Sequence, residues 1–371
     1  MLKVCHFTSA HPPYDGRIFY KECCSLVKMG YDVYLVAPGT KDELRNGVHI
    51  LGVKYEKKGR IRRMLCTANS VYKKALSLNA DVYHFHDPDL LRFASKLKRR
   101  GKKVIYDMHE DYPVNIMTKT WIPSVFRKFV SWAYVRYETK VLKLLDAVIV
   151  VTPQMEKRLE YVKKVKLVTN YPLLDGCEDI KKNDDYLKRE NILAFAGTIS
   201  TERLHHNLIK AIEDIENVKY VLAGRANSYL ESLKSLPAWQ KVIYLGVITQ
   251  EEVEDLYRRT KIGIIIENYC AVNYDDEGSL GVTKLFEYMK CSIPFICTDF
   301  KYHKDIVDKY KCGICVNPLN IKEITDAILY LLKHQEEAMQ MGRNGYKAYV
   351  EKYNWQSQES ELLDLYEKVC D

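Results

Sequence analysis

Two charged residues stand one helical turn apart in the segment Gly278–Met289. The segment opens with small, flexible residues, and Thr283 and Lys284 stand where an amphipathic helix begins. Free backbone N–H groups and the positive end of the helix dipole meet at such a start and favour an anion. Glu287 follows on the same helix face, where a carboxylate suits ribose hydroxyls better than phosphates. The spacing predicts phosphate at the helix tip and ribose at Glu287, although a helix start with solvated Lys and Glu looks the same.

Histidines gather at the ends of two predicted buried strands. The strand Asp81–His86 carries His84 and His86, and the next strand is followed by His109 and Glu110. The carboxyl ends of parallel strands form the binding crevice of an α/β sheet, so these four side chains are expected to converge there. A single histidine at a strand end is more often packed or hydrogen-bonded, and the interest lies in finding several on adjacent strands.

The sequence Asp87-Pro88-Asp89 follows the first of these strands. Asp-x-Asp resembles a metal site of nucleotide-sugar chemistry. It is also typical of a helix start, with Asp at the N-cap and Pro in the first turn. Because Pro88 explains the spacing, we predict that Asp87 caps a helix.

The charge is unevenly distributed along the chain. Residues 1–175 carry 32 Lys and Arg against 17 Asp and Glu, and residues 176–371 carry 25 against 32, which gives the net charge of +8. This asymmetry predicts two domains that meet different partners, the basic one facing an anionic membrane, a phosphorylated acceptor or nucleic acid. No RNA- or DNA-binding module is visible, which argues against nucleic acid.

The 11 cysteines are scattered and odd in number, and no signal peptide opens the sequence, so we expect free thiols in a reducing cytoplasm. The C-x-x-C from Cys312 to Cys315 has no second pair and predicts a strand with buried thiols. No apolar run reaches the ~18 residues of a membrane span. The stretch Trp121–Trp132 opens a predicted long helix and mixes aromatics with cations, which fits an interfacial membrane helix or a surface helix with a core-facing aromatic stripe.

Strands and helices alternate along the chain, with helices expected over 18–29, 60–78 and 204–215 among others, which predicts an α/β fold with two doubly wound sheets. A length of 371 residues favours two domains. We expect an N-terminal domain over 1–174, a C-terminal domain over 175–352 and a last helix over 353–371. No G-x-G-x-x-G follows the first strand, so the dinucleotide fingerprint is absent there.

Taken in order, several of these segments resemble the retaining GT-B glycosyltransferases of the family four type (group 1 glycosyltransferases). The resemblance covers nearly the whole chain and depends on the order and spacing of its motifs. The motifs are Asp15-Gly16-Arg17-Ile18, His84-Phe85-His86, the strand end with His109, Thr169-Asn170-Tyr171-Pro172, Phe195-Ala196-Gly197 with Arg203, Tyr244-Leu245-Gly246 and Thr283-Lys284-Leu285-Phe286-Glu287-Tyr288-Met289. The resemblance implies two Rossmann-like domains facing a central cleft, with the last helix crossing back to the first domain.

The resemblance also implies an acceptor site in the first domain and a sugar-nucleotide donor site in the second. Carried over residue by residue, the donor-binding residues are Gly16, Gly197, Arg203, Gly246, Thr283, Lys284 and Glu287, and the catalytic residues are His109, Arg203, Lys284 and Glu287. In this scheme His109 contacts the transferred sugar, and His84, His86 and Glu110 are the acceptor-side candidates. Two positions depart from the family pattern: Ser279 replaces a usual glutamate, and Thr198 replaces a frequent arginine.

The implied function is transfer of a sugar from a nucleotide-diphosphate sugar to a hydroxyl of a glycan or lipid-linked acceptor, with retention and without a metal or other cofactor. We expect this in cell-surface polysaccharide or glycolipid synthesis, on a cytoplasmic protein in peripheral contact with the anionic inner membrane face. The alternatives are a sugar-nucleotide epimerase or hydrolase on the same fold, and a non-catalytic sugar-nucleotide-binding protein, which Ser279 leaves open. Arg203, Lys284 and Glu287 together favour the transferase.

Overall fold

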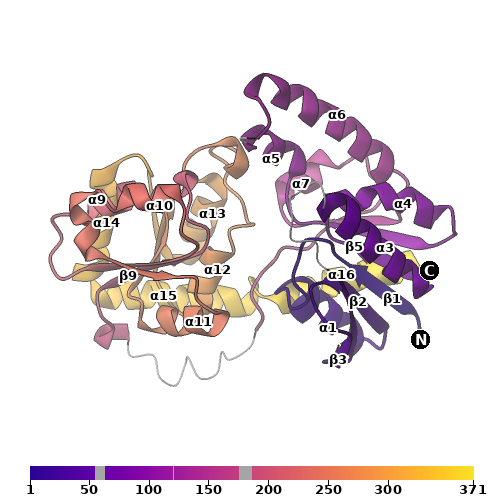
Figure 1. Cartoon of the computed structure of the whole chain (residues 1–371). Coiled ribbons are helices and arrows are strands. Elements are labelled where there is room, and N and C mark those ends of the chain that lie inside the picture. The colour runs from indigo at the N-terminus through magenta and orange to yellow at the C-terminus, as the bar shows by residue number, and fades with distance from the viewer. Residues whose placement is uncertain (55–62, 120, 175–185) are drawn as a thin grey trace. The chain divides into compact units, whose positions relative to one another are not determined.

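The computed structural model describes residues 1–54, 63–119, 121–174 and 186–371. These residues form two compact units (Figure 1). Unit 1 comprises Met1–Asn170 and Trp355–Asp371, and unit 2 comprises Tyr171–Asn354. The last helix therefore belongs to the unit that contains the N-terminus.

Unit 1 is built on an eight-stranded sheet with the order β3-β4-β2-β1-β5-β6-β7-β8. The strands are β1 (Lys3–Phe7), β2 (Asp32–Pro38), β3 (Glu43–Arg45), β4 (Val48–Val53), β5 (Val82–Phe85), β6 (Lys103–Met108), β7 (Ala147–Val150) and β8 (Val165–Leu167). All neighbours pair in parallel except β3, which is antiparallel to β4. The sequence did not predict β3, because its three residues are all exposed and carry no apolar alternation.

The helices of unit 1 connect these strands, and the last of them follows unit 2 in the chain. They are η1 (Ile18–Cys23), α1 (Cys24–Lys28), η2 (Arg63–Thr67), α3 (Ala68–Ser77), η3 (Pro88–Leu90), α4 (Leu91–Lys98), α5 (Tyr112–Thr118), α6 (Ser124–Leu142), α7 (Pro153–Arg158) and α16 (Trp355–Cys370). The helix predicted over 18–29 is a π-helical turn, η1, that continues into α1. The helix predicted over 60–78 begins outside the described residues, and its described part runs from Arg63 to Ser77.

Alternation along β5 separates two kinds of side chain. Tyr83 and Phe85 belong to the main apolar core of unit 1, whereas His84 projects to the opposite face of the sheet. The parallel register places His6 of β1 beside His84. The hydroxyl of Tyr366 on α16 lies 2.7 Å from Nδ1 of His84 and 3.1 Å from Nε2 of His6, so α16 covers this second face. This contact confirms that the last helix returns to the first unit.

Unit 2 contains a six-stranded, fully parallel sheet with the order β11-β10-β9-β12-β13-β14. The strands are β9 (Ile192–Ala196), β10 (Lys219–Ala223), β11 (Val242–Gly246), β12 (Ile262–Ile265), β13 (Phe295–Thr298) and β14 (Gly313–Val316). Two parallel-stranded α/β sheets in tandem confirm the predicted fold class. The C-x-x-C runs into β14 as predicted, and Sγ of Cys315 lies 3.7 Å from Sγ of Cys297, both as free thiols.

The longer helices of unit 2 are α9 (His205–Ala211), α10 (Ser228–Leu233), α11 (Gln250–Arg259), α12 (Thr283–Lys290), α13 (Lys301–Tyr310), α14 (Ile321–Lys333) and α15 (Gln335–Glu351). Single-turn helices are η4 (Tyr186–Lys188), η5 (Thr201–Arg203), η6 (Pro237–Lys241) and η7 (Ala271–Asn273). The helix expected over 204–215 starts one residue later, because Leu204 has φ of 39° and joins η5 to α9 by a left-handed residue, and it ends at Ala211. Across the described parts of the chain, no helix combines the length and the apolar character needed to cross a membrane.

Candidate active site

Three glycines lie at the carboxyl ends of adjacent strands in unit 2. Gly197 and Gly224 follow β9 and β10, and Gly246 ends β11. The amide of Gly224 donates to the carbonyl of Gly246 at 2.7 Å, and a Cβ on Gly224 would lie 2.1 Å from the carbonyl oxygen of Gly197. The strand-end loops therefore pack backbone against backbone, which leaves no room for a side chain at Gly224.

Two cations from distant segments lie against one aromatic ring beside these glycines. Nζ of Lys284 is 5.3 Å from the centroid of Phe195, and Cζ of Arg203 is 5.4 Å from the same centroid. Phe195 is in β9, Arg203 ends η5 and Lys284 is the second residue of α12. A Cβ on Gly197 would meet Nζ of Lys284 at 2.7 Å, so the cationic group sits directly on the β9 strand end. The structure thus brings together Arg203, Lys284 and Gly197, which the sequence placed in one donor site.

Glu267 is a member of this cluster that sequence reasoning did not single out. Its carboxylate forms an ion pair with Nη1 of Arg203 and is only 3% exposed. Within the described residues its Oε2 has no hydrogen-bond partner. Its amide donates to the hydroxyl of Thr298 at 2.7 Å, which fixes the backbone just after β12. An acidic residue at a strand end was the available signal, and the sequence alone did not show that Arg203 lies beside it.

The surroundings of Lys284 shift the pKa of its ammonium group. Burial lowers its pKa, the carboxylate of Glu287 acts in the opposite direction, and the Arg203 guanidinium lowers the pKa further. An anion bound between the two cations would offset this repulsion and favour the charged form of Lys284. The pair is therefore suited to a ligand that carries negative charge.

Glu287 lies one turn further along α12. Its Oε1 accepts a hydrogen bond from Oγ1 of Thr283 at 3.1 Å, and its Oε2 lies 3.5 Å from the hydroxyl of Tyr257. The N-cap residue of α12 is Val282, and among the described residues no side chain caps the helix start. The first amides of α12 are thus available to an anion, with the carboxylate of Glu287 on the same side as Thr283.

The remaining donor-site positions differ in exposure. Oγ of Ser279 accepts a hydrogen bond from the amide of Gly281 at 3.0 Å, and this bond closes a local turn before α12. Thr198 and Arg225 are both exposed. Gly16 lies in unit 1, exposed in the loop before η1, where the neighbouring Asp15 accepts the amides that open the helix.

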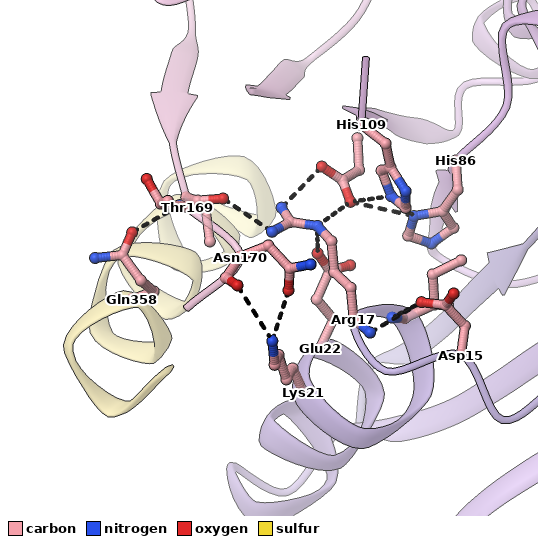
Figure 2. A network of polar contacts seen from close by, with 12 residues as sticks. Asp15, Arg17, Lys21, Glu22, His86, His109, Thr169, Asn170 and Gln358 are labelled. Carbon is pink, nitrogen blue, oxygen red and sulfur yellow. Dashed lines mark hydrogen bonds and ion pairs between the residues drawn. The ribbon is translucent and has the colours of Figure 1, made fainter. Parts of the chain in front are cut away.

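In unit 1, Arg17, His86 and His109 belong to a polar network (Figure 2), and all three contact the buried carboxylate of Asp107. Nε and Nη2 of Arg17 donate to its two carboxylate oxygens at 2.8 and 2.9 Å, and Nη1 of Arg17 donates to the carbonyl of Val168. Nε2 of His109 lies 2.7 Å from Oδ2 of Asp107, and Nδ1 of His86 lies 3.3 Å from the same oxygen. Burial opposes ionisation of Asp107, but the adjacent guanidinium of Arg17 holds its pKa well below the usual value.

The structure brings three of the four predicted strand-end residues together, since the ring centroids of His84 and His86 lie 4.7 Å apart and those of His86 and His109 lie 5.3 Å apart. His86 and His109 meet at Asp107. His84 is fully buried, because it lies within β5 rather than at its end, and bonds to Tyr366. Glu110 is exposed and accepts a hydrogen bond from Nδ2 of Asn115 at 2.6 Å. The three histidines therefore lie together as predicted, whereas Glu110 pairs with Asn115 instead.

A further histidine joins His109 at the same strand ends. The ring of His11, from the loop after β1, lies 4.8 Å from the ring of His109, and its Nε2 lies 3.6 Å from Oδ1 of Asp87. Burial alone would lower the pKa of His11, but its hydrogen bond to Asp15 and the nearby Asp87 outweigh burial and raise it. Sequence reasoning missed His11, because only folding brings its loop beside β6.

The prediction that Asp87 is the N-cap residue of a helix with Pro88 in its first turn is confirmed. Asp87 occupies the N-cap position of η3, but in the described structure its carboxylate makes no cap hydrogen bond. Its Oδ2 instead accepts the hydroxyl of Thr8 and the amide of Ser9, both at 2.7 Å. Asp89 accepts the hydroxyl of Ser9 at 2.9 Å. The Asp-x-Asp pair therefore ties the loop after β1 to the loop after β5.

Comparison with known families agrees with the motifs read from the sequence. Residues 16–170 match the family described as Glycosyltransferase Family 4, and residues 178–348 match Glycosyl transferases group 1. The chain belongs to the family 4, group 1 glycosyltransferases. Within this family, the cations and Glu287 of unit 2 fall in the group 1 region, and the histidines of unit 1 fall in the family 4 region.

Solved structures of other proteins share this fold over nearly the whole length of this chain. Sucrose-phosphate synthase from Thermosynechococcus elongatus superposes with a TM-score of 0.75 at 16% identity, covering 99% of this chain and 98% of that one. HepE from Anabaena, solved with UDP and glucose, superposes with a TM-score of 0.72 at 11% identity, covering 99% and 100%. At these identities the likeness shows the fold, which is GT-B.

A sequence relative is the uncharacterised glycosyltransferase MJ1607 of Methanocaldococcus jannaschii. It is 25% identical over 183 residues, which cover 48% of this chain and 45% of that protein. The chain spans about half the length of the curated relatives it matches.

Proposed function

We propose that this family 4 protein transfers a hexosyl group from a nucleotide-diphosphate sugar to a hydroxyl of a glycan or lipid-linked acceptor. The observation that carries the proposal is the pairing of Arg203 and Lys284 on the ring of Phe195, beside the uncapped start of α12. Glu287, one turn along, supplies the carboxylate for ribose. HepE, which shares the fold, has been solved with UDP-glucose, and this supports a nucleotide-sugar donor.

In this proposal the two cations stabilise the departing nucleotide diphosphate. Breaking the glycosyl–phosphate bond leaves new negative charge on that group. Arg203, Lys284 and the first amides of α12 are preorganised donors that neutralise it without a metal. Removal of one such donor typically costs ~3 kcal/mol of transition-state stabilisation, or about a hundredfold in rate.

We assign donor binding to the domain over 175–352 and acceptor binding to the domain over 1–174, with the helix over 353–371 returning to the latter. His109 is proposed to contact the transferred sugar, and His86 lies on the acceptor side beside it. Retention of anomeric configuration follows the family, and the departing phosphate assists the acceptor hydroxyl on the same face. His109 then positions the sugar and is not assigned as a general base.

Thermal shift against UDP, GDP, ADP and TDP tests the donor site. A ligand that binds only the folded state at a hundred times its dissociation constant adds ~2.7 kcal/mol to stability. We expect one nucleotide to raise the melting temperature and Glu287→Ala to abolish that rise. Glu351→Ala, at an exposed helical carboxylate of unit 2, is the matched control and should keep it. If the nucleotide raised the melting temperature of Glu287→Ala as much as that of wild type, the assignment of Glu287 to the donor site would be wrong.

Incubation with the responsive sugar nucleotide alone separates the transferase from its rivals. An epimerase or hydrolase would convert the donor without an acceptor, giving an epimer or free sugar by NMR. A non-catalytic binder would give the thermal shift and no product with any acceptor. The transferase is expected to consume donor only when an acceptor hydroxyl is supplied, so that a new glycoside and free nucleotide diphosphate accumulate together.

The acceptor is proposed to be presented at an anionic membrane surface, as part of cell-surface polysaccharide or glycolipid synthesis. Large apolar side chains are exposed along the start of α6 and just before it, namely Trp121, Val125, Phe126, Phe129 and Trp132. Such residues beside cations suit the membrane interface. Co-sedimentation with vesicles is expected to require anionic lipid and to fall in Phe126→Ser/Phe129→Ser. Equal recovery in the supernatant with and without anionic lipid would count against membrane contact.

A further inference from the structure

Unit 1 contains a buried cluster of metal-binding side chains from three separate segments. The members are His6 of β1, Glu22 of η1, His84 of β5 and His86, which follows β5. All four are 0 to 2% exposed, and one ligand atom from each lies within 4.8 Å of the others. Three imidazoles and a carboxylate form a ligand set that suits zinc and related transition metals.

The spacing of the ligand atoms fits a single ion. Nδ1 of His6 lies 3.0 Å from Nε2 of His86, and Oε2 of Glu22 lies 3.9 Å from both Nδ1 of His6 and Nε2 of His84. With Zn–N and Zn–O bonds of about 2.0–2.1 Å, the edges of a tetrahedron are about 3.3–3.4 Å. Because all four ligand atoms lie within 4.8 Å of one another, shifts of up to about 1 Å would complete four-coordination.

Two of these ligand atoms lack a hydrogen bond although they are fully buried. Nε2 of His84 and Oε2 of Glu22 have no hydrogen-bond partner among the residues that the structure describes. Buried polar atoms are nearly always paired, so an unpaired nitrogen and an unpaired carboxylate oxygen facing each other need an explanation. An ion between them would satisfy both.

The opposite side of each imidazole is held by an oxygen atom. The hydroxyl of Tyr366 lies 3.1 Å from Nε2 of His6 and 2.7 Å from Nδ1 of His84. Oδ2 of Asp107 lies 3.3 Å from Nδ1 of His86. Histidines that ligate a metal almost always donate their other ring N–H to an oxygen in this way, which fixes the tautomer and the ring orientation.

We propose that unit 1 binds one structural Zn²⁺ ion through Nδ1 of His6, Oε2 of Glu22, Nε2 of His84 and Nε2 of His86. Four protein ligands and complete burial leave no open position, so the ion stabilises the fold and takes no part in sugar transfer. It joins β1, η1 and β5 beneath α16. This inference goes beyond the proposed function and stands independently of it.

The neighbouring group formed by His86, Asp107 and His109 is not the proposed site. Its atoms are paired with one another, at 3.3, 2.7 and 3.2 Å. Asp107 and His109 contact Nδ1 of His86, whereas the proposed zinc ion would be bound by Nε2 of the same residue.

Metal content of the intact chain tests the proposal. The full chain is expressed in zinc-supplemented medium without a polyhistidine tag and analysed by inductively coupled plasma mass spectrometry. We expect about one zinc ion per chain, and a melting temperature that falls when zinc is removed by a chelator. Zinc below about a tenth of an ion per chain, with a melting temperature that the chelator does not change, would overturn the proposal.

Substitutions identify the ligands. His84→Gln and Glu22→Gln are expected to lose the zinc. The matched control is His205→Gln in unit 2, because His205 is also buried, lies 2.8 Å from a tyrosine hydroxyl and has an unpaired Nε2 in the described structure. This control is expected to keep the zinc. Zinc retained by both ligand variants, or lost by the control alone, would overturn the assignment.

Cobalt substitution of the wild-type chain keeps the test independent of whether the variants fold. Chain produced in medium in which Co²⁺ replaces zinc is expected to show the intense visible absorption of four-coordinate Co²⁺. Cobalt that is absent from the chain, or present only with the weak absorption of six-coordinate Co²⁺, would contradict a closed four-ligand site.

Discussion

Lys284 occupies the space in which a side chain at residue 197 would begin. A Cβ on Gly197 would lie 2.5 Å from Cε and 2.7 Å from Nζ of that lysine. Such distances are not tolerated between real atoms, so the glycine at the end of β9 and the lysine at the start of α12 form one steric unit. The position of the cationic group is therefore set by a missing side chain as much as by its own helix.

Gly197→Ala is expected to displace Lys284 and lower kcat/KM for sugar transfer by about tenfold to a hundredfold, because a cation that stabilises the leaving group is misplaced. Steady-state kinetics with the identified donor measure the effect. A double-mutant cycle with Lys284→Ala is the control. If Gly197→Ala acts by displacing Lys284, it lowers kcat/KM little further in the Lys284→Ala variant. Fully additive losses of kcat/KM would show that the two changes are independent.

Glu267→Gln is expected to lower kcat/KM by about tenfold, since Arg203 loses the carboxylate that orients it, and Arg203→Ala by about a hundredfold. Arg225→Ala is the matched control, because this exposed arginine also follows a strand end of unit 2. We expect it to stay within about threefold of wild type, as one unpositioned surface cation contributes little. A loss with Arg225→Ala as large as that with Arg203→Ala would mean that the wrong cation has been assigned.

Arg17→Lys is expected to destabilise unit 1 by about 3–5 kcal/mol, because an ammonium cannot reproduce the two-pronged contact with Asp107 and leaves buried charge poorly paired. Urea unfolding followed by circular dichroism measures the change. Arg99→Lys, at an exposed arginine, is the control and should lie within about 0.5 kcal/mol of wild type. Equal stability of Arg17→Lys and wild type would show that the ion pair of Figure 2 is not needed for folding.

His205 predicts an acid sensitivity of unit 2. Burial, together with the nearby Arg203 and His206, lowers the pKa of His205 from 6.5 to about 3. The unfolded chain binds a proton below pH about 6.5 and the folded chain does not, so stability is fully present above that pH and falls as the pH drops towards 3.

The expected loss from this histidine between pH 7 and pH 5 is about 2 kcal/mol. Urea unfolding of wild type and His205→Gln at both pH values isolates this contribution. Wild type should lose about 2 kcal/mol more than the variant over this interval. Parallel losses in the two proteins would show that His205 is not kept neutral by the fold.

The fold was largely predictable because buried parallel strands are short apolar runs separated by helices of regular period. Both sheets and the last helix follow from that alternation. The predicted elements differ from the structure where the apolar pattern of the sequence does not mark a strand or a helix end. The edge strand β3 has three exposed residues, and the left-handed Leu204 sets the start of α9 without a glycine to mark it.

The candidate sites were predictable only in part. Lys284 and Glu287 stand out because a helix start and a one-turn spacing are local features. Glu267 and Asp107 gain their significance from partners 64 and 90 residues away in the sequence, Arg203 and Arg17, and no local pattern marks such pairs. Asp87 stands at the N-cap position that its local sequence indicates, but its hydrogen bonds to the loop after β1 could not be predicted from that sequence.

The placement of Tyr366 has a consequence for how the protein is made. Its hydroxyl covers His6 and His84, yet it lies on α16, which is translated after the whole of unit 2. Domains generally fold in the order of their synthesis, N-terminal first. Here unit 1 lacks α16 until all of unit 2 has been translated. Unit 2 is therefore able to reach its native state before unit 1 is completed by α16.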